Sequence, residues 1–213
     1  MAADGRVHGH NADVQFRSAS MTKAMLMVAV LRGAASRPLT GREKRWLEPM
    51  ITESDNDAGR KIYRRVGDLG MSAVARAGRM HHFLPVGALF EARITAADQA
   101  RFFLRIDRLV PARHRDYARA LLAGIIGPQR WGIAPVATRR HFAAFFKAGW
   151  RKGLVHQAAL LERGGRRIAL AILTSGEPTV AYGKVTLAGI AARILDQEGD
   201  RDDGDAQQSE EQL

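Results

Sequence analysis

The stretch SASMTKAMLMVAVL, residues 18 to 31, constrains the fold most, because from Met21 onward it is apolar except for Thr22 and Lys23. A run of this length and composition predicts a buried helix over residues 20–33, with Ser18 or Ser20 as its N-cap. Lys23 then lies in the first turn, where both burial and the helix dipole oppose a positive charge. A lysine in such a place suggests a chemical role.

Length and charge indicate one basic domain with an acidic end. The 213 residues are 46% hydrophobic, which is enough for one core of ordinary size. We expect a single domain over residues 1–195 and a disordered tail over residues 196–213, which hold eight acidic residues and one arginine. The remaining 32 basic and 14 acidic residues would attract nucleic acid or an anionic cell envelope. An arginine-rich surface without a partner is the simpler explanation.

The absence of cysteine excludes disulfides, a thiolate nucleophile and cysteine-ligated metals. The first residues, MAADGRVHGHNADVQF, lack the basic region and apolar stretch of a signal peptide, and no uncharged apolar run reaches membrane-spanning length. We therefore expect no export signal in this sequence and no membrane span. The sequence gives no indication of the oligomeric state.

Apolar periodicity and cap residues predict the remaining elements. Helices are expected at residues 40–51, 57–66, 71–77, 94–106, 118–126 and 184–195. Residues 80–92 have no clean period and predict a loop. Three β-compatible runs are expected at residues 141–150, 153–165 and 166–176, with a tight turn between the last two. Helices followed by an antiparallel sheet and a closing helix predict an α+β fold.

Ser20 and Lys23 form a candidate nucleophile and base. On a helix they lie three residues apart on one face, and the free N–H groups of the first turn can stabilise negative charge at Ser20. A lysine desolvated by the surrounding methionines has a lowered pKa, and its neutral amine can take the serine proton. The alternative is a lysine in a frayed turn with its amine in water.

Two further segments carry polar groups of the same kind. Ser54-Asp55-Asn56 lies between two predicted helices, where a hydroxyl and an amide can point into a cleft, although all three residues are also good N-caps. Lys147 and Gly149 lie on a predicted strand near the end of the chain. The lysine could be an ordinary edge-strand charge, and the glycine would let another group approach the backbone closely.

The order Ser-x-x-Lys, Ser-Asp-Asn and Lys-x-Gly is far more specific than any one of these motifs. With them the sequence resembles the superfamily of serine β-lactamases and penicillin-binding proteins (D,D-peptidases), and in particular its class A β-lactamase branch. The likeness runs from about Phe16 to Leu195 and includes GDLGMSAVARAG, ITAADQARFF and the strands from FFKAGW to LAILTSG. It implies a β-lactamase/transpeptidase-like α+β fold, an antiparallel sheet flanked by helices with a mostly helical subdomain.

The resemblance also implies roles for individual residues. Ser20 would be the acylated nucleophile and Lys23 its general base. Ser54 would relay a proton to the leaving nitrogen, while Asn56 would hold Lys23 and the side-chain amide of the substrate. Lys147 would supply positive potential for the substrate carboxylate and lower the pKa of Ser54.

The same resemblance places Gly149 and Trp150 in the substrate-binding strand. Backbone N–H groups of Ser20 and Trp150 would form the oxyanion hole. No metal or organic cofactor is implied, the substrate would be a small molecule or peptidoglycan-like material, and the protein would be exported.

Several departures from the family pattern bear on turnover. Ala148 stands where the family usually has a hydroxyl that binds the substrate carboxylate. The loop Met80–Ala92 is short, lacks the Glu-x-x-x-Asn pattern that positions the deacylating water, and has Glu91 as its only acid, at the wrong end. We therefore expect slow deacylation. Only 19 residues precede Ser20, too few for the first helix and two opening strands of the family, so we expect either that the start of the sequence is misplaced or that an edge of the sheet is missing.

Other residues have competing explanations. His81 and His82 could suggest a metal site, but adjacent residues on an extended segment point apart, which disfavours it. Arg130-Trp131-Gly132 lies where the family closes its cleft, so it could contact substrate or be a packed tryptophan beside a solvated arginine.

Three functions are compatible with these patterns. The leading hypothesis is a serine hydrolase acylated at Ser20 by an amide or ester. The second is a catalytically impaired binding protein that keeps the fold, suggested by Ala148 and the missing loop glutamate. The third is a nucleic-acid binder, for which only the basic composition speaks, since no helix-turn-helix, zinc-ligand or aromatic RNA-binding pattern is present.

Overall fold

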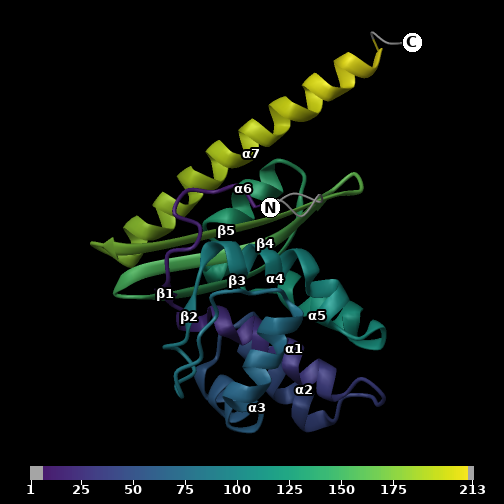
Figure 1. Ribbon diagram of the computed structural model, residues 1–213, viewed down its shortest axis with the longest axis vertical. Helices are drawn as coiled ribbons and strands as arrows, with labels where there is room; N and C mark the ends of the chain where they lie inside the picture. Colours follow the sequence, from purple (N-terminus) through teal and green to yellow (C-terminus); the bar gives the residue numbers. More distant parts are fainter. Residues whose placement is uncertain (1–6, 211–213) are drawn as a thin grey trace.

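The computed structural model describes the backbone of residues 7–210 and the side chains of residues 7–197. Its elements in chain order are β1 (Phe16–Arg17), η1 (Ala19–Met21), α1 (Thr22–Gly33), α2 (Gly41–Thr52), α3 (Asn56–Ala77), β2 (Arg93–Ile94), α4 (Ala96–Leu109), η2 (Ala112–His114), α5 (Arg115–Ala123), η3 (Gly127–Gln129), α6 (Ile133–Arg139), β3 (Ala143–Arg151), β4 (Gly153–Arg163), β5 (Arg166–Glu177) and α7 (Val180–Glu210). The predicted α+β fold is confirmed (Figure 1).

Helix α1 is the buried helix that the sequence predicts. It packs against α2, α3 and α4, as a helix that is apolar on all sides must. The predicted cap is wrong, because neither Ser18 nor Ser20 makes a side-chain cap bond. The 3₁₀ helix η1, which is one turn long, continues directly into α1, so the N-cap position of α1 falls on Met21.

The other helix starts follow local signals in the sequence. Thr40 and Glu43 form a capping box at the start of α2, and the Thr95 hydroxyl accepts a hydrogen bond from the Asp98 N–H at the start of α4. Gly67 has φ 59° and ψ −177° inside α3. This break separates the two helices that the sequence predicts for this segment.

The main sheet is antiparallel with the order β3-β4-β5. Its two hairpins keep an unbroken register over most of their length, which places Gly149 opposite His156. The β4–β5 turn is made by Gly164 and Gly165, both with positive φ, as predicted for a tight hairpin. The pair β1–β2 is separate and was not predicted, because each strand has only two residues.

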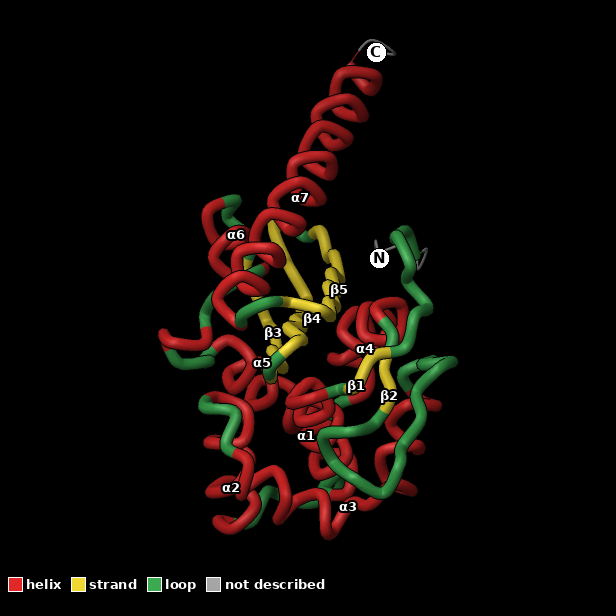
Figure 2. The backbone as a smooth tube through the Cα atoms, turned by 90° about the vertical axis from the view of Figure 1, so that its left-hand side faces the viewer, coloured by secondary structure: helices red, strands yellow, loops and turns green. Residues whose placement is uncertain are grey.

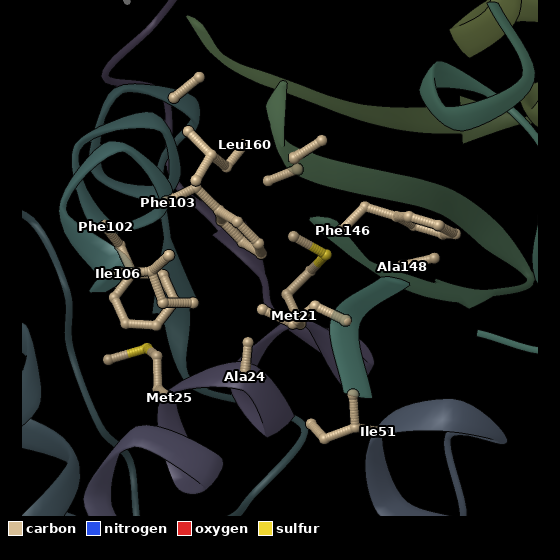
Figure 3. Close-up of a cluster of buried hydrophobic side chains, with 14 of the residues drawn as sticks. Met21, Ala24, Met25, Ile51, Phe102, Phe103, Ile106, Phe146, Ala148 and Leu160 are labelled. Carbon is tan, nitrogen blue, oxygen red and sulfur yellow. The ribbon is translucent and has the colours of Figure 1, made fainter. Parts of the chain in front are cut away.

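The elements form layers on both faces of the sheet. Helices α6 and α7 lie on one face, while α4 and α5 cover the other and separate it from α1–α3 (Figures 1 and 2). Helix α6 was not predicted, since its seven residues are too few for a helical period to show. The core between α1, α4 and the sheet contains Met21, Met25, Phe102, Phe103 and Leu160 (Figure 3).

Helix α7 begins earlier and runs further than the predicted helix 184–195. Its backbone is helical to Glu210, and Asp196 accepts hydrogen bonds from Arg140. Side chains from residue 198 on, and residues 211–213, lie outside the described residues, so the disordered tail over 196–213 stays a prediction. Across the described part of the chain, no helix combines the length and apolar character that spanning a membrane needs.

Candidate active site

Lys23 is fully buried, and its amine is hydrogen-bonded. Its Nζ donates to the main-chain oxygen of Ser54, to Ser54 Oγ at 3.3 Å and to Asn56 Oδ1 at 2.8 Å. Asp55, the N-cap of α3, fixes this junction by accepting the Ala58 N–H at 2.7 Å. Three oxygens thus match the three hydrogens of the ammonium group, which makes its burial tolerable.

Lys147 reaches the same serine from β3. Its buried Nζ donates to Ser54 Oγ at 3.0 Å and to the main-chain oxygen of Ala148 at 2.9 Å. Ser54 has φ 57°, which is uncommon for a residue other than glycine. In this conformation the Ser54 hydroxyl lies between two lysine amines, and its carbonyl faces one of them.

Both amines have lowered pKa values. Burial lowers the pKa of Lys23 to about 8, against the opposing charge of Asp55. Burial also holds the pKa of Lys147 well below its ordinary value, and the nearby charge of Lys23 lowers it further. A proton is therefore lost from this pair more easily than from exposed lysines, and the neutral form of Lys23 becomes substantial as the pH approaches 8.

Ser20 lies in the turn η1, directly against β3. The preceding residue, Ala19, has φ 45°. A Cβ built on Gly149 would lie 2.9 Å from the backbone nitrogens of Ser20 and Met21, and 3.0 Å from the Ser18 carbonyl. Only glycine fits there, so the backbone of β3 at Gly149 packs directly against the backbone of the turn that carries Ser20.

The Ser20 hydroxyl itself makes no hydrogen bond to any residue whose side chain is described, while the amine of Lys23 points toward Ser54. In proteins without substrate, catalytic hydrogen bonds are often long and tighten on binding. The structure thus joins Lys23, Ser54, Asn56 and Lys147 by direct contact. Ser20 is placed beside them by the backbone, one turn before Lys23.

Two carboxylates anchor the first part of the loop 80–92. Asp98 accepts the backbone N–H groups of His81 and His82, each at 2.7 Å, and Asp68 accepts the Gly87 N–H at 2.8 Å. The backbone of both histidines therefore helps to hold this loop in place. Among the described residues no group of His, Cys, Asp and Glu is arranged to hold a metal ion.

The end of this loop contacts the candidate base. The Phe90 ring centroid lies 5.2 Å from Lys23 Nζ. Glu91 instead forms ion pairs with Arg151 at 2.6 Å and Arg17 at 3.3 Å. The one acid of the loop is therefore committed to arginines, and an aromatic ring occupies the side of Lys23 that faces the loop.

Three residues that support the site were not predicted. A Cβ on Gly59 would lie 3.1 Å from Lys23 Cε; a glycine inside a predicted helix was the available signal. Buried His156 accepts the Thr174 N–H at 3.2 Å, so its other nitrogen donates to the Arg17 carbonyl at 3.1 Å. This bond holds the strand that leads into Ser20. Neither His156 nor Phe90 had a distinguishing sequence pattern.

The segment Arg130-Trp131-Gly132 fits the packing alternative. Trp131 is buried, with its ring edge-to-face at 5.6 Å from that of Trp150. Exposed Arg130 donates to the Ala123 carbonyl. Trp150 is thereby packed from the α6 side of the sheet, next to Gly149.

A match to a known family accompanies this geometry. The sequence pattern described as the Beta-lactamase enzyme family matches residues 44–197, more than half of the chain. The chain belongs to this family. The matched region includes Ser54, Asn56 and Lys147 but begins after Ser20 and Lys23. For the Ser-x-x-Lys motif of this β-lactamase-family chain, the support is therefore the set of contacts described above. No curated protein matches the sequence.

Solved structures confirm the predicted class A-like fold. The β-lactamase from Sphaerobacter thermophilus is 21% identical, with 93% of this chain and 88% of that chain covered and a TM-score of 0.76. A class A β-lactamase from Mycobacterium abscessus is 18% identical, with 92% and 90% covered and a TM-score of 0.76. The structure of PBP-A is 16% identical, with 89% and 83% covered and a TM-score of 0.75. Identities this low establish the fold alone.

Proposed function

We propose that this β-lactamase-family chain is a serine hydrolase that is acylated at Ser20 by an amide or ester and deacylates slowly. The observation that carries the proposal is the position of the Ser54 hydroxyl between two buried amines whose pKa values are lowered. This arrangement can remove a proton on one side of a reacting bond and deliver it on the other.

Acylation follows from the placement of these groups. Neutral Lys23 takes the proton of Ser20 as Oγ attacks the substrate carbonyl carbon, and the carbonyl oxygen becomes an oxyanion. Backbone N–H groups of Ser20 and Trp150, on segments in direct contact at Gly149, stabilise that charge. Ser54 then passes a proton from the lysine pair to the leaving nitrogen or oxygen. The bond to the leaving group breaks, and acyl-Ser20 remains.

Slow deacylation is supported by the loop 80–92. Hydrolysis of acyl-Ser20 needs a water molecule and a base that removes its proton. Glu91 is paired with two arginines, and the Phe90 ring packs on the Lys23 amine. Glu91 is therefore not free to act as that base, and the Phe90 side chain has no basic group. We expect the acyl-enzyme to accumulate.

The same contacts bear on the substrate. A carboxylate of the substrate would stabilise the protonated form of Lys147 and thereby favour the neutral form of Lys23. Ala148 offers no hydroxyl to that carboxylate, so recognition depends on Lys147. Together with the family and the net charge of +11, this favours an anionic peptidoglycan-like substrate outside the cytoplasmic membrane.

Labelling with a fluorescent penicillin tests the proposal. Intact mass spectrometry should show one adduct on the parent protein and none on Ser20→Ala, with the adduct persisting over many minutes. Circular dichroism of both proteins controls for folding. Absence of any adduct on well-folded parent protein, with a fluorophosphonate as a second probe, would contradict acylation.

A binding protein that has lost turnover is the second candidate. It is favoured by Ala148 and by the Ser20 hydroxyl, which makes no hydrogen bond to any side chain or backbone group among the described residues. Steady turnover of an ester or β-lactam that disappears in Ser20→Ala would exclude it.

A further inference from the structure

Three charged side chains gather beside the nucleophile and take no part in the steps above. Arg151 Nη1 lies 2.6 Å from one oxygen of Glu91, and Arg17 Nη1 lies 3.3 Å from the other. We call these three residues the acyl-side cluster. Two guanidinium groups share one carboxylate, so the acyl-side cluster has an excess positive charge.

The acyl-side cluster is tied to the backbone around Ser20. Arg17 precedes Ser20 by three residues. On either side of Glu91, the carbonyls of Phe90 and Ala92 accept the N–H groups of Ala19 and Ser18, at 3.1 and 2.8 Å. Glu91 is therefore held against the chain segment that carries the nucleophile.

Arg151 is placed by the alternation of β3. Side chains two residues apart share a face of a strand, so Arg151 lies on the face of Lys147 and Gly149. Gly149 contacts the backbone of Ser20, which puts Lys147 on one side of the nucleophile and Arg151 on the other, about 13 Å apart along the strand. A substrate whose carboxylate pairs with Lys147 extends its acyl side chain toward Arg151.

From this placement we infer that Arg17 and Arg151 select acyl donors whose side chain carries a carboxylate. The inference deepens the proposed function and depends on it for the direction of the substrate. The side chains of Arg17, Glu91 and Arg151 are 49%, 37% and 39% exposed. Ion pairs at this exposure are weak and rearrange readily, so a ligand carboxylate can join or replace Glu91. Guanidinium groups suit such an exchange because they bind carboxylates in a two-point geometry.

Two penicillins that differ by one side-chain carboxylate test the inference. Carbenicillin and benzylpenicillin are titrated into Ser20→Ala, which binds without reacting, and their Kd values are measured by protein NMR at low ionic strength. We expect carbenicillin to bind about fivefold more tightly, the scale of a partly exposed charge pair. Adding Arg151→Gln should remove the preference, and adding Glu91→Gln should enlarge it, because a competing carboxylate is lost.

Arg42→Gln is the matched control, since it removes an exposed arginine on α2 and should leave the preference unchanged. Equal affinities for the two penicillins, or a preference that survives Arg151→Gln, would overturn the inference. If equal binding accompanies an adduct on Ser20 in the parent protein, the proposed function stands. If neither penicillin binds the folded protein, the inference and the proposed function both fail.

Discussion

Gly149→Ala is the substitution for which the structure gives the sharpest expectation. The added Cβ would stand 2.9 Å from two backbone nitrogens and 3.0 Å from a carbonyl oxygen, all in the turn that carries Ser20. Backbone atoms cannot rotate out of the way as a side chain does. Strand β3 and the turn η1 must therefore separate by about half an ångström to restore ordinary contact distances.

That separation has two measurable effects. Overpacking of a fitted contact costs about 1–3 kcal/mol of unfolding free energy. The two backbone N–H donors of the proposed oxyanion hole lie on the two segments that move apart. Because a 1 Å displacement at reacting groups can cost about 100-fold in rate, a separation of about half that size should slow acylation of Ser20 by about tenfold.

The assay compares second-order acylation rates, by intact mass, with urea unfolding of the same samples. Gly189→Ala is the control, because a Cβ at that helical position meets nothing within 4 Å, and both quantities should stay near the parent values. A folded Gly149→Ala protein with parent-like acylation would refute the argument that contact with β3 positions the nucleophile.

Three further outcomes follow from single residues. The acylation rate should rise with pH and level off above about pH 8, since the neutral amine of Lys23 is the base; a flat rate between pH 6 and 9 would contradict this. Burial lowers the pKa of His156 from 6.5 to about 4. As the pH falls from 6.5 to 4, this histidine therefore binds a proton in the unfolded chain before it does so in the folded protein. The free energy of unfolding should drop by about 3 kcal/mol over this pH range. Urea unfolding should show a shallower drop for His156→Gln, and parallel pH curves would rule out the histidine as the cause. Phe90→Glu should shorten the lifetime of acyl-Ser20 at least tenfold by supplying a base beside Lys23, measured as adduct loss after removal of free penicillin, with Phe90→Leu as a control that keeps the long lifetime.

Much of the fold is predictable because its signals are local. Helix α1 is predicted by its long apolar run, α2 and α4 by threonine caps, and the β4–β5 turn by two adjacent glycines. The two-residue strands and α6 carry too few residues for a period to show. The cap of α1 was mispredicted because a 3₁₀ turn continuous with the helix leaves both serines free of the role that their position suggests.

The site divides along similar lines. Ser20, Lys23, Ser54 and Lys147 could be proposed because hydroxyls and amines carry chemistry that the order of motifs makes specific. Phe90 could not, since an aromatic residue in an irregular loop gives no indication that its ring packs on a lysine amine. Contacts of that kind depend on how the loop 80–92 is anchored at residues far away in the sequence.

The interaction between the two lysine amines explains how Lys23 can lie buried in an apolar helix and still act as a base. Both approach Ser54 Oγ, so holding a full charge on each is unfavourable. A substrate carboxylate at Lys147 draws the charge to that amine and leaves Lys23 as the one that loses its proton. The base is then generated where an anionic substrate has already bound, next to the hydroxyl that it must deprotonate, and it stays hydrogen-bonded through Asn56 in the absence of substrate.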